Sequence, residues 1–164
     1  VLTPPDGAPV PVSGLGWYDK QWGDFVPVAV AWDWASVQLN DGTDLMVSVL
    51  WDGEWRLVDA YATLRRTDEP ALRLGRGDFT LTPVNADTWV SPDTGTRYPT
   101  RWRFSAPAHG LELVLDPLVV DSETASAVLG VAYWEAGVDV LNARGEKVGQ
   151  GFVELSWPRG TSTR

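Results

Sequence analysis

Apolar and polar residues alternate along most of the chain, which is the pattern of β-strands with one buried face. No window keeps a helical periodicity over the ~11 residues of an average helix. The pattern therefore predicts an all-β protein. The expected strands lie within residues 10–19, 28–39, 45–51, 55–64, 79–82, 88–91, 97–105, 111–115, 128–141 and 148–157.

Short turns join several of these strands directly. Residues 40–42 (Asn-Asp-Gly) and 52–53 (Asp-Gly) tolerate positive φ, so residues 28–64 are expected to form an antiparallel meander. Residues 143–146 are expected to join the last two strands as a hairpin. About nine or ten antiparallel strands favour closure into a β-barrel, because closure removes exposed edges. Such a barrel can hold one small ligand, and a β-sandwich is the alternative.

The composition excludes several kinds of function. The chain has 164 residues, as expected for one domain, and contains no Cys, which excludes disulfides, thiolate nucleophiles and zinc–thiolate sites. Its net charge of -9 argues against a nucleic-acid partner. No apolar run approaches the ~20 residues of a membrane helix, and no signal peptide is recognisable. We expect a soluble, cytoplasmic protein, and, since the sequence does not begin with Met, a chain that is processed or cut from a longer one.

Ten Trp residues make the chain unusually aromatic. Trp32 and Trp34 share one face of the strand expected over 28–39, and Ser36 and Gln38 continue that face. Indole rings mixed with hydrogen-bonding side chains are typical of pockets for apolar ligands. The same pattern also fits a packed core, so the alternation alone does not decide between them.

Asp33 lies between these two Trp residues and points to the opposite face. If that face is the core, its carboxyl group needs a partner, for which Arg101 and Arg103 are the candidates. If it borders the pocket, Asp33 contacts the ligand.

Asp19 is the first candidate acid. It lies two residues after Trp17 and close to Trp22, so on a strand its carboxyl group would be next to indole rings. Loss of hydration there favours the protonated form, which suits a general acid that protonates an alkene. Alternatively, Asp19 ends a strand and pairs with Lys20.

A second candidate acid, Glu135, shares a strand face with Tyr133, whereas Trp134 points to the other face. A carboxyl group and a phenol side by side can form a proton relay. A buried Glu–Arg pair is the alternative, and Glu154 carries the same ambiguity.

The remaining motifs indicate no cofactor. His109 is the only His and has no nucleophile motif near it. Asp41, Asp44 and Asp52 lie in or beside turns and lack the spacing of a calcium-binding loop. No glycine-rich phosphate loop is present.

Several segments have a distinctive order and spacing. They are residues 17–23 (WYDKQWG), 32–46 (WDWASVQLNDGTDLM), 78–83 (DFTLTP), 91–99 (SPDTGTRYP), 133–138 (YWEAGV) and 151–155 (GFVEL). In this order they resemble the C-terminal half of the carotenoid 1,2-hydratase (hydroxyneurosporene synthase) family of lipocalin-like proteins, over nearly the whole chain. Lys20 stands where the family motif has His or Arg, and residues 156–158 (SWP) stand where it has a Gly–aromatic pair.

The resemblance implies that residues 1–164 form one lipocalin-like barrel domain, from a family with two such domains packed together. A second lipocalin-like domain or a second copy of the chain is then an expected partner. The resemblance also implies a long apolar ligand, no cofactor, and proton donation by the acid that matches Asp19. Family members include hydratases that add water to an isolated isoprenoid double bond, and lipocalin-like pericyclases (Diels-Alderases) are more distantly similar.

Three functions are consistent with these features. An enzyme would bind a polyene, isoprenoid or polyketide-type molecule and hydrate or cyclise it, a carrier would only hold it, and a structural domain would pack its Trp residues against a missing domain. The sequence favours the enzyme. Its predicted catalytic residues are Asp19, Glu135 and Tyr133, and its predicted substrate-binding residues are Trp17, Trp32, Asp33, Trp34, Gln38 and Trp134.

Overall fold

The structure is a computed structural model and describes residues 1–20, 31–84, 87–126 and 131–156. Within these ranges the chain forms β-strands, one short 3₁₀ helix, η2 (Pro107–His109), and no α-helix. The prediction of an all-β fold is confirmed. The strands are β1 (Ala31–Leu39), β2 (Asp44–Trp51), β3 (Leu57–Arg65), β4 (Leu72–Leu74), β5 (Thr80–Pro83), β6 (Thr88–Val90), β7 (Arg97–Pro99), β8 (Trp102–Ala106), β9 (Leu111–Pro117), β10 (Glu123–Ser126), β11 (Val131–Leu141) and β12 (Lys147–Ser156).

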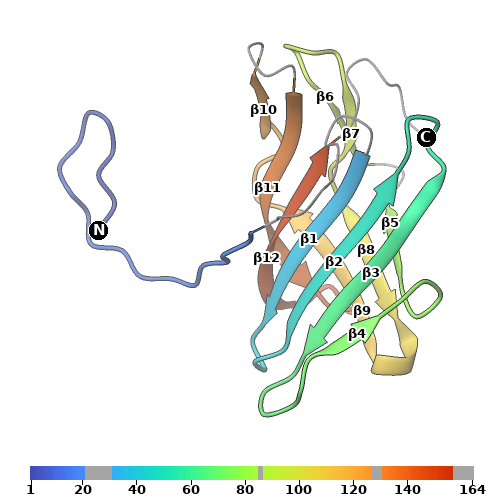
Figure 1. The fold of residues 1–164 in the computed structure, drawn as a ribbon. Helices are drawn as coiled ribbons and strands as arrows, with labels where there is room; N and C mark the ends of the chain where they lie inside the picture. The colour runs from blue at the N-terminus through green and yellow to red at the C-terminus, as the bar shows by residue number, and fades with distance from the viewer. Residues whose placement is uncertain (21–30, 85–86, 127–130, 157–164) are drawn as a thin grey trace.

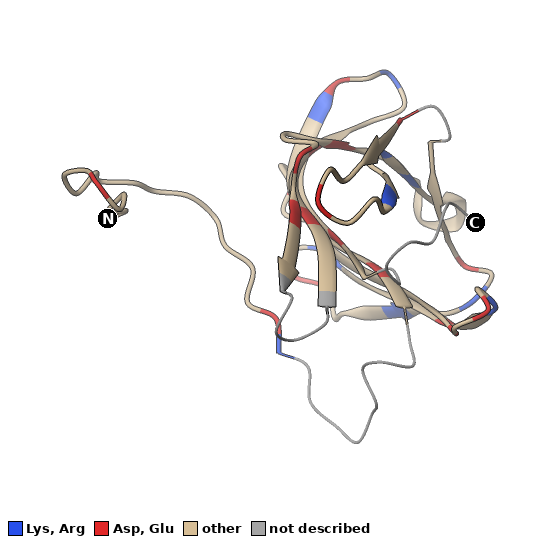
Figure 2. Cartoon of the chain, turned by 90° about the horizontal axis from the view of Figure 1, so that it is seen from above, with Lys and Arg blue, Asp and Glu red and all other residues tan. Residues whose placement is uncertain are grey.

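All but two of the strands belong to one antiparallel sheet, in the order β4-β3-β2-β1-β12-β11-β9-β8-β5, with β10 also paired to β11. The sheet curls into a lipocalin-like half-barrel, as Figure 1 shows from the side and Figure 2 from above. The meander β1–β2–β3 and the final hairpin β11–β12 are confirmed. Strands β6 and β7 form a separate two-stranded sheet.

The inner face of the curled sheet carries the hydrophobic core. Because side chains alternate along a strand, every second residue of β1, β8, β11 and β12 points into it. Each large apolar side chain buried there contributes roughly 1.5–3 kcal/mol. The largest fully buried side chains are Trp102, Trp134, Tyr98, Phe104, Leu45, Leu64, Leu74, Leu115 and Leu155.

Asp33 lies on this inner face and is completely buried. The Nε1–H group of Trp51 donates a hydrogen bond to Asp33 Oδ2 over 2.9 Å. The arginine partner that the sequence suggested for Asp33 is wrong, because Arg101 pairs with Asp116 at 2.7 Å. Arg103 points away from the core, since Trp102 and Phe104 take the inner positions of β8.

The N-terminal segment differs from its prediction. Residues 11–20 form no strand, although one was expected over residues 10–19. Leu2 and Val10 pair through backbone hydrogen bonds of 2.8 and 2.9 Å, and Pro11, which lacks an N–H group, follows Val10 directly. The segment extends from the barrel and joins it beside β1 (Figure 1).

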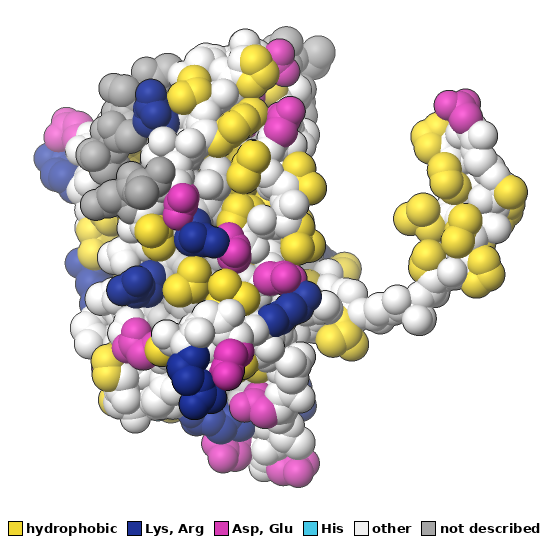
Figure 3. Space-filling model, turned by 180° about the vertical axis from the view of Figure 1, so that it is seen from behind, with side chains coloured by type: hydrophobic (Ala, Val, Ile, Leu, Met, Phe, Trp, Pro, Cys, Tyr) yellow, Lys and Arg dark blue, Asp and Glu magenta, His cyan; other side chains and the backbone are white. Residues whose placement is uncertain are grey.

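The surface is charged and mixed. Figure 3 shows acidic and basic side chains interspersed on the face opposite to the view of Figure 1, with hydrophobic side chains gathered in its upper half. Acidic residues also lie along the strands next to the N-terminal segment (Figure 2). Across the described ranges, no helix is long and apolar enough to cross a bilayer.

Candidate functional site

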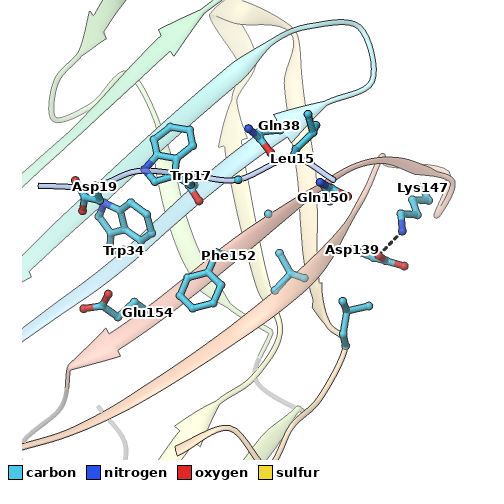
Figure 4. A pocket seen from close by; sticks show the side chains of 15 residues that line it. Leu15, Trp17, Asp19, Trp34, Gln38, Asp139, Lys147, Gln150, Phe152 and Glu154 are labelled. Atoms are coloured by element: carbon cyan, nitrogen blue, oxygen red, sulfur yellow. Dashed lines mark ion pairs between the residues drawn. The ribbon is translucent and has the colours of Figure 1, made fainter. Parts of the chain in front are cut away.

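A pocket of about 570 Å³ lies on the outer face of the sheet, between the N-terminal segment and strands β1, β11 and β12. Figure 4 shows the segment that carries Trp17 passing in front of these strands. Side chains on the outer faces of β1, β11 and β12 therefore meet in this pocket. The pocket is lined by Leu15, Gly16, Trp17, Asp19, Trp34, Ser36, Gln38, Leu118, Val138, Asp139, Lys147, Gln150, Gly151, Phe152 and Glu154.

Two glycines of β12 let its backbone lie close to β1. A Cβ atom added to Gly151 would be 2.4 Å from Ser36 O, and one added to Gly149 would be 2.4 Å from Gln38 O. The resulting register places Phe152 opposite Ser36 and Gln150 opposite Gln38 on the outer face. The floor of the pocket thus depends on the two glycines of β12 as well as on its larger side chains.

Aromatic rings form the middle of the pocket. The rings of Trp17 and Trp34 pack edge to face, with centroids 6.2 Å apart and an interplanar angle of 71°. Phe152 lies on β12 between Glu154 and Gln150, as Figure 4 shows. This arrangement offers π faces and apolar edges to a ligand, as pockets for apolar molecules do.

Three carboxyl groups gather at one end of the pocket, and we call Asp19, Glu135 and Glu154 the carboxylate cluster. Glu135 and Glu154 are direct cross-strand partners on β11 and β12, and the outer-face alternation puts both on the pocket side of the sheet. Trp32 Nε1–H donates a hydrogen bond to Glu154 Oε1 over 2.8 Å. Burial raises the pKa of Glu154; the Trp32 hydrogen bond opposes this, and the negative charges of Glu135 and Asp19 raise the pKa further.

Tyr133 stands next to this cluster. Its ring centroid is 5.7 Å from that of Trp32, with the rings tilted by 38°. Tyr133 and Glu135 lie on one face of β11, as the sequence predicted, because they are two residues apart on a continuous strand. The pair therefore flanks the Trp32–Glu154 hydrogen bond.

The opposite end of the pocket is polar without excess charge. Lys147 Nζ lies 2.5 Å from Asp139 Oδ1, which neutralises both groups (Figure 4). The amides of Gln38 and Gln150 lie beside this pair. Along β12, Gln150 is four residues from Glu154, or roughly 13 Å at ~3.3 Å per residue. The pocket thus has an acidic end, an aromatic middle and an amide end.

A family model described as AttH-like matches residues 3–157. The chain belongs to the AttH-like family. No curated protein matches it in sequence.

Two solved structures share the fold of this AttH-like chain. A candidate AttH protein from Nitrosomonas europaea is 30% identical with a TM-score of 0.70, over 81% of this chain and 40% of its own. Kievitone hydratase from Nectria haematococca is 20% identical with a TM-score of 0.68, over 86% of this chain and 43% of its own. The AttH-like chain therefore spans less than half the length of either protein.

The pocket brings together many of the residues that the sequence singled out in this AttH-like chain. Trp17, Asp19, Trp34 and Gln38 line it. Trp32, Tyr133 and Glu135 adjoin it through Glu154. Trp22, which the sequence placed near Asp19, lies outside the described residues.

Two predicted ligand contacts are in the core instead. Asp33 and Trp134 are completely buried on the inner face. The indole N–H group of Trp134 donates to Val120 O over 2.8 Å, so its polar atom is satisfied by the backbone. Their alternation relative to Trp32 and Glu135 explains the placement, because adjacent residues of a strand point to opposite faces.

Asp19 differs from its predicted environment. It is exposed to solvent on a segment without strand structure, so the Trp rings do not strip its carboxyl group of water. Glu154 is the half-buried acid instead. Only the pairing of its strand, β12, with β1 could have revealed this. Among the described residues, no three His, Asp or Glu side chains are placed to hold a metal ion.

Proposed function

We propose that this AttH-like chain binds a long, mainly apolar molecule in the outer-face pocket and adds water to one of its double bonds. The observation that carries the proposal is the carboxylate cluster at one end of an aromatic pocket. A carboxylic acid can protonate an alkene, and nearby indole rings can stabilise the cation that results. The fold shared with kievitone hydratase is consistent with this chemistry.

The pocket also indicates the shape of the ligand. Its volume of about 570 Å³ is in the range of pockets for small organic molecules. An isoprenoid or polyketide-type chain would lie across Trp34 and Phe152, with its double bond near Glu154. An oxygen function at the far end would accept hydrogen bonds from the amides of Gln38 and Gln150.

The reaction needs one proton donor and one acceptor. A carboxyl O–H group of the cluster gives its proton to one alkene carbon, so that a C–H bond forms, the π bond breaks and the cation forms on the more substituted carbon. Water attacks that carbon and forms the C–O bond. The extra proton of the attacking water passes to a carboxylate of the cluster, with Tyr133 as a relay, and restores the starting state. Asp19 is the donor that the family resemblance implies.

The remainder of a longer protein would complete the site. In this proposal residues 1–164 are one lipocalin-like domain that carries the pocket, and the related structures are about twice as long. A second lipocalin-like domain, or a second copy of this chain, would cover the side that the N-terminal segment leaves open. The activity belongs to the assembled protein in this proposal.

Binding is tested first, with farnesol and squalene as isoprenoid probes and Trp fluorescence as the signal. We expect quenching, and an affinity about tenfold weaker in Trp34→Ala, since an aromatic contact of about 1.4 kcal/mol corresponds to that factor. Trp89→Ala is the matched control, because Trp89 packs on Tyr98 away from the pocket. Equal affinities in both variants would contradict the proposed site.

Conversion is tested by mass spectrometry in D₂O. Hydration gives a product heavier than the probe by one D₂O, with one deuterium on carbon. Binding without any change in mass would assign the chain to the carriers. A product of unchanged mass and no carbon-bound deuterium would indicate cyclisation.

A further inference from the structure

We infer that Glu154 is the member of the carboxylate cluster that keeps its proton to the highest pH, because it is half-buried and lies beside two other acidic side chains, Glu135 and Asp19. The chemical role of this proton rests on the proposed function. The protonation itself follows from the surroundings of the three acids and can be measured without a substrate.

The three carboxyl groups differ in hydration. Asp19 is exposed, so water stabilises its charge. Glu154 is half-buried under the N-terminal segment, next to Trp32 and Trp34, and its charged form loses water. Desolvation favours the neutral form of an acid, and the pKa of Glu154 is accordingly raised.

The charges around Glu154 act in the same direction. The charged groups on the elements packed against it are Asp19 and Lys20 on the N-terminal segment, Glu135 and Asp139 on β11, and Lys147 on β12. Lys147 is neutralised by Asp139 at the far end of the pocket, and Lys20 is exposed to solvent. Glu135 is the direct cross-strand partner of Glu154, so removing one negative charge from this pair relieves repulsion.

Trp32 determines which oxygen carries the proton. The carbonyl oxygen of a carboxylic acid is a better hydrogen-bond acceptor than its hydroxyl oxygen, so the bond of 2.8 Å from Trp32 Nε1 favours Glu154 Oε1 as the carbonyl oxygen. The proton therefore lies on Oε2. Trp32 is a positioning residue in this scheme, because its hydrogen bond and its contact with Tyr133 hold the carboxyl group in one orientation.

The proton that Glu154 loses in the reaction is replaced by one from the attacking water. Glu154 Oε2–H gives its proton to the alkene and becomes a carboxylate, which Trp32 Nε1–H stabilises. A proton from the attacking water returns to Glu154, directly or through Glu135 and Tyr133. No oxidant, reductant or other co-reactant is needed besides water.

The protonation is tested by carboxyl ¹³C NMR of the full chain labelled at Glu, with Glu154 assigned from the signal lost in Glu154→Gln. We expect Glu154 to titrate at higher pH in the folded chain than the Glu signals of the urea-unfolded chain. Its midpoint should fall in Glu135→Gln, which removes a negative charge, and rise in Trp32→Phe, which removes the hydrogen bond to the charged form. A Glu154 midpoint equal to that of the Glu signals in the urea-unfolded chain, or unmoved by Glu135→Gln, would overturn the inference.

The role in catalysis is tested with farnesol hydration followed against pH. A general acid contributes ~10²–10⁴-fold, so Glu154→Gln should lower turnover by that order at every pH. Glu135→Gln should move the alkaline limb of the profile to lower pH, in step with the NMR midpoint. Loss of the same order in Asp19→Asn, with turnover kept in Glu154→Gln, would make Asp19 the donor and overturn the role of Glu154. A raised NMR midpoint without hydration of any probe would confirm the protonation and contradict the proposed function.

Discussion

Each face of the sheet around β1 carries a hydrogen bond between an indole and a carboxyl group, but the two bonds have different roles. On the inner face, the indole of Trp51 donates to the completely buried carboxyl group of Asp33. On the outer face, the indole of Trp32 donates to Glu154, which borders a pocket. The first pair is enclosed by core side chains, whereas the second has two acidic neighbours and room for a ligand. An indole–carboxyl contact is therefore structural or functional according to what surrounds it.

An excess of Trp therefore does not by itself locate a binding site. Trp102 and Trp134 fill the core, while Trp17 and Trp34 pack against each other at the surface pocket. Adjacent positions of a strand point to opposite faces, so one side chain enters the core and the next faces the pocket. Substitutions on the two faces should accordingly affect different properties of the protein.

The largest expected effect is on stability and comes from the inner face. Trp134→Ala should lower the free energy of unfolding by about 3–5 kcal/mol, because it removes a fully buried indole and leaves a cavity. Trp34→Ala should cost only about 1 kcal/mol, the order of one aromatic contact. Urea unfolding measures both, and comparable losses would mean that Trp34 also belongs to the core.

The second comparison removes the same N–H group from each face. Trp51→Phe should cost about 1–3 kcal/mol, because it takes a donor from a completely buried carboxyl group. Trp32→Phe removes the donor to half-buried Glu154 and should cost about 0.5–1.5 kcal/mol. Urea unfolding at one pH compares them. An equal or larger loss in Trp32→Phe would contradict the distinction between the faces.

The smallest effect is a dependence of stability on pH. The folded chain binds more protons than the unfolded chain between the ordinary pKa of a Glu side chain and the raised pKa of Glu154, so this residue lowers stability as the pH rises through that window. Glu154→Gln removes that loss and keeps an acceptor for Trp32. Relative to the natural chain, it should be more stable at pH 8 than at pH 4, as measured by urea midpoints.

Glu69→Gln is the matched control for this measurement, because Glu69 is exposed. Its urea midpoint at the two pH values gives the pH dependence of a Glu→Gln change at an exposed position, against which that of Glu154→Gln is compared. A relative stability of Glu154→Gln that does not change with pH would show that Glu154 has the same pKa in the folded and unfolded chain, and would contradict the raised pKa.

Much of the sheet could be predicted from alternation and turns. Strand β1 ends at Leu39, where its predicted run ended, and β12 spans Lys147–Ser156 against a prediction of 148–157. Residues 10–19 were predicted wrongly, because strand-forming residues make no strand without a neighbour to pair with. The wrong partner for Asp33 has a related cause, since charge alone does not tell which face of β8 is turned inward.

The sequence predicted most of the residues of the site, but not the face of the sheet on which they lie. Alternation separated Trp32 from Asp33, yet it could not say which face is the core. Glu154 could not be ranked above Asp19 either, because its contact with Trp32 joins residues 122 positions apart in sequence. Strand order and register, which depend on the whole fold, bring them together.

The most direct test of an outer-face ligand site is a ¹⁵N–¹H spectrum of the indole groups during titration with farnesol. The ten Trp residues give separate probes of both faces. We expect the signals of Trp17, Trp32 and Trp34 to shift, while those of Trp102 and Trp134 stay in place. Shifts confined to Trp102 and Trp134 would place the ligand inside the barrel and contradict this expectation.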